Sequence, residues 1–278
     1  LAGFGHSVRD KLVPLLIPQN NEPAFSGVHL IPQILVAIGD TSILPVLYQA
    51  SDTPNHLLRH NALQAYASLL KKLFTHKPYL SEIYAQIQKE MSLAQHRKKQ
   101  IISLALTPQT QLLRDAFENI QMLHLKNAFA LLDALLPTMN ILTIRDTLLR
   151  NDKTQNNALE ILDNVLPKQC KQEVIDFFES GNQKPTQTDP IAFDQILSKE
   201  EDIWVICGAL MAIASLKTPI DEHLLLSNLT HPHPVVRETT LYTLREQNKL
   251  HIFDNQYHTL LEDPDESVKM LAHQYLKK

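Results

Sequence analysis

Two histidines on a proline-rich loop have the type and spacing that metal binding requires. His231 and His233 alternate with Pro232 and Pro234, so both imidazoles could reach one ion. A zinc site, however, needs three or four protein ligands. The other histidines in this region are too far away in sequence to be assigned to the same ion. We therefore interpret the segment as a loop and predict no metal site and no cofactor.

Basic residues recur where helices are expected to begin, each directly after an apolar residue. The four positions are Arg9, Arg59, Arg237 and Lys269, and the last two are 32 positions apart. Such a ladder could bind anions or a partner through charge-assisted hydrogen bonds. The favoured alternative is a structural role, in which each cation pairs with an acidic side chain or a helix-end carbonyl of a neighbour. We retain Arg59 and Arg237 as candidate partner-binding residues.

A basic run, Arg97, Lys98 and Lys99, could contact nucleic acid or acidic lipid. Adjacent residues point in different directions around a helix, and Glu82 and Glu90 are close in sequence, so a solvated helix face is the favoured interpretation. We keep the three residues as candidate partner contacts. The formal net charge of the chain is -4. A general binder of phosphate backbones would show a basic excess, so we expect no nucleic-acid partner.

Motifs of the common catalytic classes are missing from this sequence. It contains neither HExxH nor GxSxG. None of its six glycines lies between Gly39 and Gly181, so a glycine-rich phosphate-binding loop is not expected in that stretch. Cys170 and Cys207 belong to no CxxC pair, which predicts reduced and packed thiols. We predict a protein that is not an enzyme and has no catalytic residues.

Helical periodicity dominates the segments that would position these groups. Over residues 57–70, apolar side chains recur at spacings of three and four, and no long stretch alternates apolar with polar residues. Prolines stand mostly at expected helix starts, where a missing N–H costs nothing. Pro32 lies within an apolar helical pattern, so it should either kink that helix or begin it. The apolar run Ile203–Leu216 is too short to span a membrane, which predicts a buried helix.

One helix-entry pattern returns several times along the chain. Residues 59–63 and 155–159 share Asn-Ala-Leu, and residues 237–241 and 202–210 fit the same frame with small residues before leucine. Recurrence of this kind indicates stacked helix pairs. The turn-forming stretch 181–189 predicts a surface loop between a longer array over residues 1–180 and a shorter one over residues 190–278.

The segments His231–Arg237 and Glu262–Lys269 resemble HEAT repeats, with Asp or His before proline and then Val-Arg or Val-Lys opening a helix. This resemblance implies a right-handed α–α superhelix, an armadillo-like α-solenoid of about six to seven antiparallel helix pairs. Arrays of this kind bind their partners on an extended concave face.

A narrower resemblance rests on Asn157–Pro167 and on Trp204, which follows it. These residues are similar to the soluble HEAT-repeat region of bacterial ADP/ATP-antiporter-like transporter proteins. The resemblance implies a soluble, cytoplasmic interaction or coupling scaffold within a larger, membrane-anchored protein. Its partners would be other proteins or neighbouring domains of the same chain.

Two other functions remain open at this point. One is a HEAT-like enzyme or lyase that acts on a small ligand in the concave groove, and the other is a HEAT protein that binds nucleic acid. The iron-binding HEAT hydroxylases carry recurring His-Glu dipeptides, and this chain has none. The sequence also begins inside what looks like a repeat, which predicts exposed apolar surface at Leu12, Val13, Leu15 and Leu16.

Overall fold

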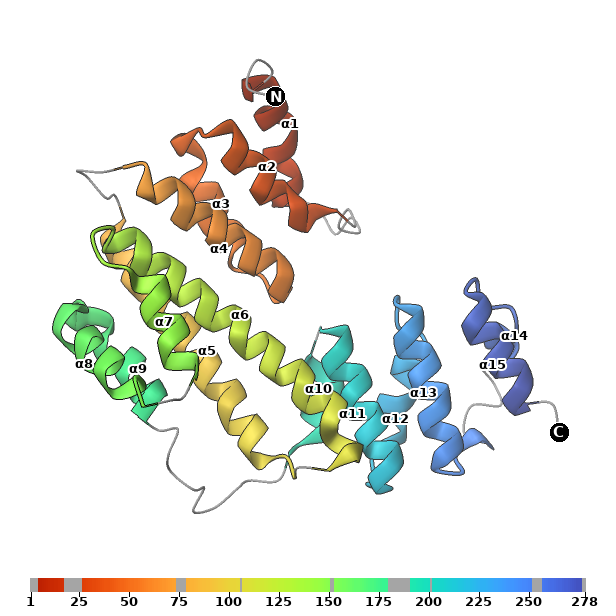
Figure 1. The fold of residues 1–278 in the computed structure, drawn as a ribbon. Helices are drawn as coiled ribbons and strands as arrows, with labels where there is room; N and C mark the ends of the chain where they lie inside the picture. The colour runs from red at the N-terminus through yellow and green to blue at the C-terminus, as the bar shows by residue number, and fades with distance from the viewer. Residues whose placement is uncertain are drawn as a thin grey trace. The chain divides into compact units, whose positions relative to one another are not determined.

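Helices are the regular elements of this chain in the computed structural model (Figure 1). The structure describes residues 5–17, 27–73, 79–105, 107–150, 153–179, 191–200, 202–251 and 257–276. Within these ranges there is no strand, so the prediction of an all-α protein is confirmed. The α-helices are α1 (Gly5–Leu16), α2 (Ile31–Ile38), α3 (Leu44–Ala50), α4 (His56–Lys71), α5 (Leu80–Ser103), α6 (Gln111–Leu135), α7 (Ile141–Arg150), α8 (Gln155–Val165), α9 (Lys168–Glu179), α10 (Phe193–Lys199), α11 (Ile203–Leu216), α12 (Glu222–Asn228), α13 (Pro234–Glu246), α14 (Tyr257–Leu261) and α15 (Glu266–Leu276), with short 3-10 turns η2 (Val28–Leu30), η3 (Thr41–Ile43) and η4 (Pro108–Thr110).

The helices divide between two compact units. Unit 1 comprises residues 1–97 and 120–184, and unit 2 comprises residues 98–119 and 185–278. Each of the two long helices, α5 and α6, therefore contributes one end to each unit. The loop predicted over residues 181–189 lies outside the described residues.

In unit 1, α4 is the central helix of the N-terminal part, since it packs against both α2 and α3. The side-chain oxygen of Asn55 accepts a hydrogen bond from the Leu58 N–H and so caps the helix. An N-cap of this kind typically contributes about 1 kcal/mol to stability. Leu63 and Leu69 are fully buried on its apolar stripe, as the periodicity over residues 57–70 predicts.

Proline sets the first turn of several helices. Pro32, Pro45 and Pro234 all stand at the first or second position of α2, α3 and α13, where the ring fits the helical φ angle. Pro32 therefore begins its helix and does not kink it. This result decides between the two roles that the sequence left open for Pro32.

Helix α1 corrects one expectation about exposed apolar surface. Leu15 is exposed as predicted, but Leu16 is only 3% exposed and belongs to the core, while Leu12 and Val13 are partly buried against that core. The reason is that α1 packs against α2 and α3. The four residues therefore do not form one open apolar face.

Unit 2 repeats one arrangement three times, with a short helix followed by a longer one. The longer helices α11, α13 and α15 pack side by side in chain order (Figure 1). Their capping residues are Asp202, His233 and Asp265. Asp202 and Asp265 each accept two backbone N–H groups of the helix that they precede, and His233 accepts one. These caps are 31 and 32 positions apart. The recurrence seen in the sequence thus corresponds to a recurrent helix pair.

Helix α11 has the bounds that the sequence predicted, and most of its side chains are buried. Gly208 lies against the backbone of Leu113, and a Cβ atom at that position would stand 2.6 Å from the Leu113 Cα. Cys207 and Cys170 are both buried and unbridged, as predicted. A search of the described helices finds none with the length and apolar character needed to cross a bilayer.

Candidate functional site

Arg59 and Arg237 occupy the same position in their helices, four residues after the N-cap. The Arg59 Nε donates to the Thr53 carbonyl at 3.0 Å, two residues before the cap Asn55. The Arg237 Nη1 donates at 2.8 Å to the His231 carbonyl, which is likewise two residues before its cap. Both guanidinium groups therefore stabilise the turn that leads into their own helix, and both side chains are buried.

Each of these arginines also meets an acidic side chain from later in the chain. Arg237 forms two hydrogen bonds with Asp263, and the Arg59 Nη1 lies 3.9 Å from Glu90 Oε1. Arg9 completes the series, because its Nη1 lies 2.6 Å from Asp40 Oδ2. The favoured structural role of the arginine ladder is thus what these side chains perform. At the fourth position the Lys269 Nζ lies 3.4 Å from a carboxylate oxygen of Glu266 on its own helix.

The basic run lies on α5 and does not form one face. Arg97 and Lys98 are partly buried, whereas Lys99 is exposed. Burial lowers the pKa of the Lys98 ammonium. Adjacent positions on a helix diverge by roughly 100°, so the three side chains do not converge on a single ligand.

The loop of His231 and His233 uses its imidazoles to organise the backbone. The Nδ1 atom of His231 accepts the His233 N–H at 3.0 Å, and the Nδ1 atom of His233 accepts the Val235 N–H at 3.3 Å. These nitrogens are therefore occupied as acceptors. No group of three potential metal ligands is present in the part of the chain that the structure describes.

A buried polar network in unit 1 was not identified from the sequence. Its centre is Glu90 on α5, which is fully buried. Glu90 Oε2 accepts hydrogen bonds from His124 Nδ1 at 2.8 Å and from Asn127 Nδ2 at 2.9 Å, and Oε1 accepts one from Gln86 Nε2 at 3.0 Å. With Arg59 nearby, the carboxylate is surrounded by donors from α4, α5 and α6.

The environment of Glu90 determines its charge. Burial alone would raise the pKa of this carboxyl group, but the hydrogen bonds from His124 and Asn127 and the charge of Arg59 outweigh burial, so the pKa is lowered. Burial also lowers the pKa of His124, more than the neighbouring carboxylate raises it. At neutral pH the network therefore holds one carboxylate, one guanidinium and a neutral imidazole.

One sequence signal could have revealed this network. Ile83, Ile87, Glu90 and Ala94 recur at helical spacing, so Glu90 stands in the apolar stripe of α5. A carboxylate in such a position is almost never fully buried unless it is paired. The identity of its partners, 34 and 37 residues away, was not accessible from that pattern.

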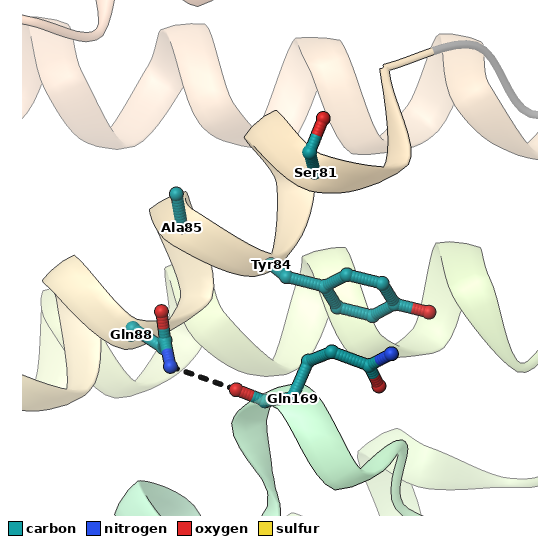
Figure 2. A pocket seen from close by; sticks show the side chains of 5 residues that line it. All are labelled: Ser81, Tyr84, Ala85, Gln88 and Gln169. Atoms are coloured by element: carbon teal, nitrogen blue, oxygen red, sulfur yellow. Dashed lines mark hydrogen bonds between the residues drawn. The ribbon is translucent and has the colours of Figure 1, made fainter.

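An open groove of about 550 Å³ lies between the first turns of α5 and the start of α9, also in unit 1 (Figure 2). Ser81, Tyr84, Ala85, Gln88 and Gln169 line it. The Gln88 side chain donates to the Gln169 carbonyl at 2.7 Å and to Glu173 at 2.8 Å, which joins the two helices.

The groove offers neutral polar groups beside an aromatic ring. The side chain of Gln169 extends along the Tyr84 ring (Figure 2). Across the described ranges, no hydrogen bond involves the Tyr84 hydroxyl or the Gln169 side-chain amide. Partial burial raises the pKa of Tyr84, which keeps its hydroxyl protonated at neutral pH. These two side chains can therefore donate to and accept from a ligand that reaches the groove.

Comparison with protein-family models, with curated proteins and with solved structures finds no match to this chain.

Proposed function

We propose that the chain is a non-catalytic interaction scaffold that binds a polypeptide segment in the groove between α5 and α9. The observation that carries the proposal is the presence of the Tyr84 hydroxyl and the Gln169 side-chain amide in an open groove whose lining has no cationic or anionic side chain. A peptide backbone presents the same neutral donors and acceptors. Phosphate groups would require the cations that this lining lacks.

The proposal includes a HEAT-like right-handed solenoid as the architecture. The three helix pairs of unit 2, with their caps 31 and 32 positions apart, support it. So does the shared position of Arg59 and Arg237, which places one type of contact in both units. Repeats that contact only their neighbours build extended arrays, and such arrays bind through their surfaces.

The proposal also includes the larger, transporter-like protein that the resemblance at Asn157–Pro167 suggests. In it, the scaffold lies on the cytoplasmic side of a larger, transporter-like protein and couples that protein to a partner or to a neighbouring domain. Arg97, Lys98 and Lys99 would contribute peripheral contacts, since Lys99 is exposed on α5. Arg59 and Arg237 would act through the helices that they hold in place.

A display library of random peptides, selected on the whole chain at neutral pH, tests this function. Selected peptides should bind the wild-type protein and lose at least about tenfold in affinity on Tyr84→Ala or Gln169→Ala, which corresponds to about 1.4 kcal/mol. Gln172→Ala is the matched control, because Gln172 is exposed on the same helix and donates a hydrogen bond to Asp176 of that helix. Equal binding to all variants would refute the groove as the site. Tight binding of duplex DNA at physiological salt would contradict the scaffold function itself.

A further inference from the structure

Three histidines gather around the buried network of unit 1. His56 and His60 lie on α4 and His124 on α6. The rings of His56 and His124 meet edge to face, with centroids 5.5 Å apart. His60 Nδ1 lies 2.6 Å from Asn127 Oδ1, and Asn127 in turn donates to Glu90. One hydrogen-bonded chain thus runs from α4 through α6 to α5.

The hydrogen bonds of this series determine which ring nitrogen of each histidine carries the proton. An ionised carboxylate only accepts hydrogen bonds, so His124 must carry its proton on Nδ1 to bond Glu90. Asn127 uses its amide nitrogen toward Glu90, so its oxygen faces His60, which must also carry its proton on Nδ1. Any further proton must therefore enter at Nε2 and create an imidazolium.

The surroundings of these rings have little capacity for added positive charge. At neutral pH the single carboxylate of Glu90 is already balanced by Arg59. His60 also faces the positive charge of Lys126 and of any charged His124. His124 is only 3% exposed, so water cannot screen a charge on it. Protonating both rings would place three cationic groups, Arg59, His60 and His124, around the buried carboxylate of Glu90, where charges interact strongly. The exposed Lys126 adds a further positive charge on the solvent side.

We propose that the cluster of His56, His60, His124 and Glu90 is an acid-sensitive clasp that holds α4 against α5 and α6 at neutral pH and releases it under mild acid. The clasp goes beyond the proposed peptide binding and does not depend on it. Its contacts join three consecutive helices through side chains that are 34 to 67 positions apart in the sequence. Uptake of protons by His60 and His124 removes the charge balance on which those contacts depend.

The sign of the effect follows from burial. Desolvation lowers the pKa of His60 and of His124 below the ordinary histidine value in the folded protein. The opened state, with ordinary histidines, therefore binds more protons below about pH 6.5. The stability of the closed clasp is fully present above that pH and is lost as the pH falls toward the folded pKa values. Each excess proton taken up by the open state weakens the clasp by up to about tenfold per pH unit.

Hydrogen exchange of the whole chain, followed by mass spectrometry, measures the opening. After correction for intrinsic rates, protection of α4 should fall at least about tenfold between about pH 7.5 and pH 5.5. The double variant His60→Asn and His124→Asn should lose no such protection, since the asparagine amide can replace the Nδ1–H donor but cannot be protonated. His223→Asn is the control, because His223 is exposed on α12 in unit 2 and should leave the wild-type response unchanged.

Two results would overturn the clasp. One is constant protection of α4 in the wild type across this range, and the other is an equal loss in the double variant. Should the double variant not fold, NMR titration of the wild-type imidazoles decides instead. His60 and His124 must then titrate below the ordinary histidine pKa, and titration at or above it refutes the proposal. Peptide binding is measured at neutral pH, so its failure would leave the clasp intact.

Discussion

Arg237 and Asp263 meet in a two-pronged ion pair between α13 and the turn that precedes α15. The Arg237 Nε lies 2.8 Å from Asp263 Oδ2, and Nη2 lies 2.6 Å from Oδ1. Both side chains are almost fully buried, at 11% and 6% exposure. Because Arg237 also bonds the His231 carbonyl, one guanidinium ties the entry of its own helix to the next repeat.

Breaking this pair from one side should be costly. Asp263→Ala leaves the Arg237 guanidinium buried without its counter-ion, and loss of one partner of a buried pair typically costs about 3–5 kcal/mol. The urea concentration at the midpoint of unfolding should therefore be clearly lower for Asp263→Ala than for the wild type. The double variant Arg237→Met and Asp263→Leu should recover part of the loss, since no buried charge remains, but the hydrogen bonds from Arg237 to the His231 and Pro232 carbonyls are also removed.

Lys269→Met provides the control for the pair, because the exposed contact between Lys269 and Glu266 is worth at most about 1 kcal/mol. If Asp263→Ala changed the midpoint no more than Lys269→Met does, the pair would not hold the two repeats together.

Gly208→Ala should destabilise the protein even though alanine favours helices. A Cβ at this position would lie 2.6 Å from the Cα and 2.7 Å from the N atom of Leu113, so backbone would have to move. Overpacking of this kind typically costs about 1–3 kcal/mol, more than the helix-propensity gain of about 1 kcal/mol. Thermal denaturation should show a lower Tm, whereas Ser215→Ala, on the exposed side of α11, should leave it nearly unchanged. A higher Tm for Gly208→Ala would contradict the close approach.

The carboxyl group of Asp40 should titrate far below an ordinary aspartate. Hydrogen bonds from Ser42 are the largest cause, and Arg9 adds to them, so that the pKa is lowered to about 2. Its contribution to stability is therefore present above the ordinary aspartate value and is lost as the pH falls toward about 2. In carbon-detected NMR, Arg9→Gln should raise the pKa only in part, since the Ser42 N–H remains. Full return to the ordinary value in that variant would show that Arg9, and not Ser42, dominates.

Both thiols should be inert in the folded protein. Burial raises the pKa of Cys170 to about 11 and also raises that of Cys207. The thiolate is the reacting species, so an aromatic disulfide reagent should label neither cysteine at neutral pH until denaturant is added. Rapid labelling of the native protein, with Cys170→Ala and Cys207→Ala variants to identify the site, would contradict their burial.

The candidate sites divide according to how local their signals are. The role of Arg59 and Arg237 could be anticipated, because each contacts a carbonyl only five or six residues away. Lys269 was grouped with them on the same pattern, yet its contact is a different one, since no acidic side chain from another helix pairs with it in the described residues. The groove between Tyr84 and Gln169 gave no signal, as its two sides are 85 positions apart.

The sequence by itself determined that segments such as residues 57–70 and 203–216 are helical and that prolines begin helices. Apolar periodicity and proline in the first turn act over a few residues, and their energies depend on local backbone geometry. Only the tertiary structure decided that Glu90 meets His124 and Asn127, and that a groove opens between α5 and α9. Burial and hydrogen bonding between distant segments depend on which helix faces pack together. That choice is made by the summed apolar contacts of the core, which no local pattern encodes.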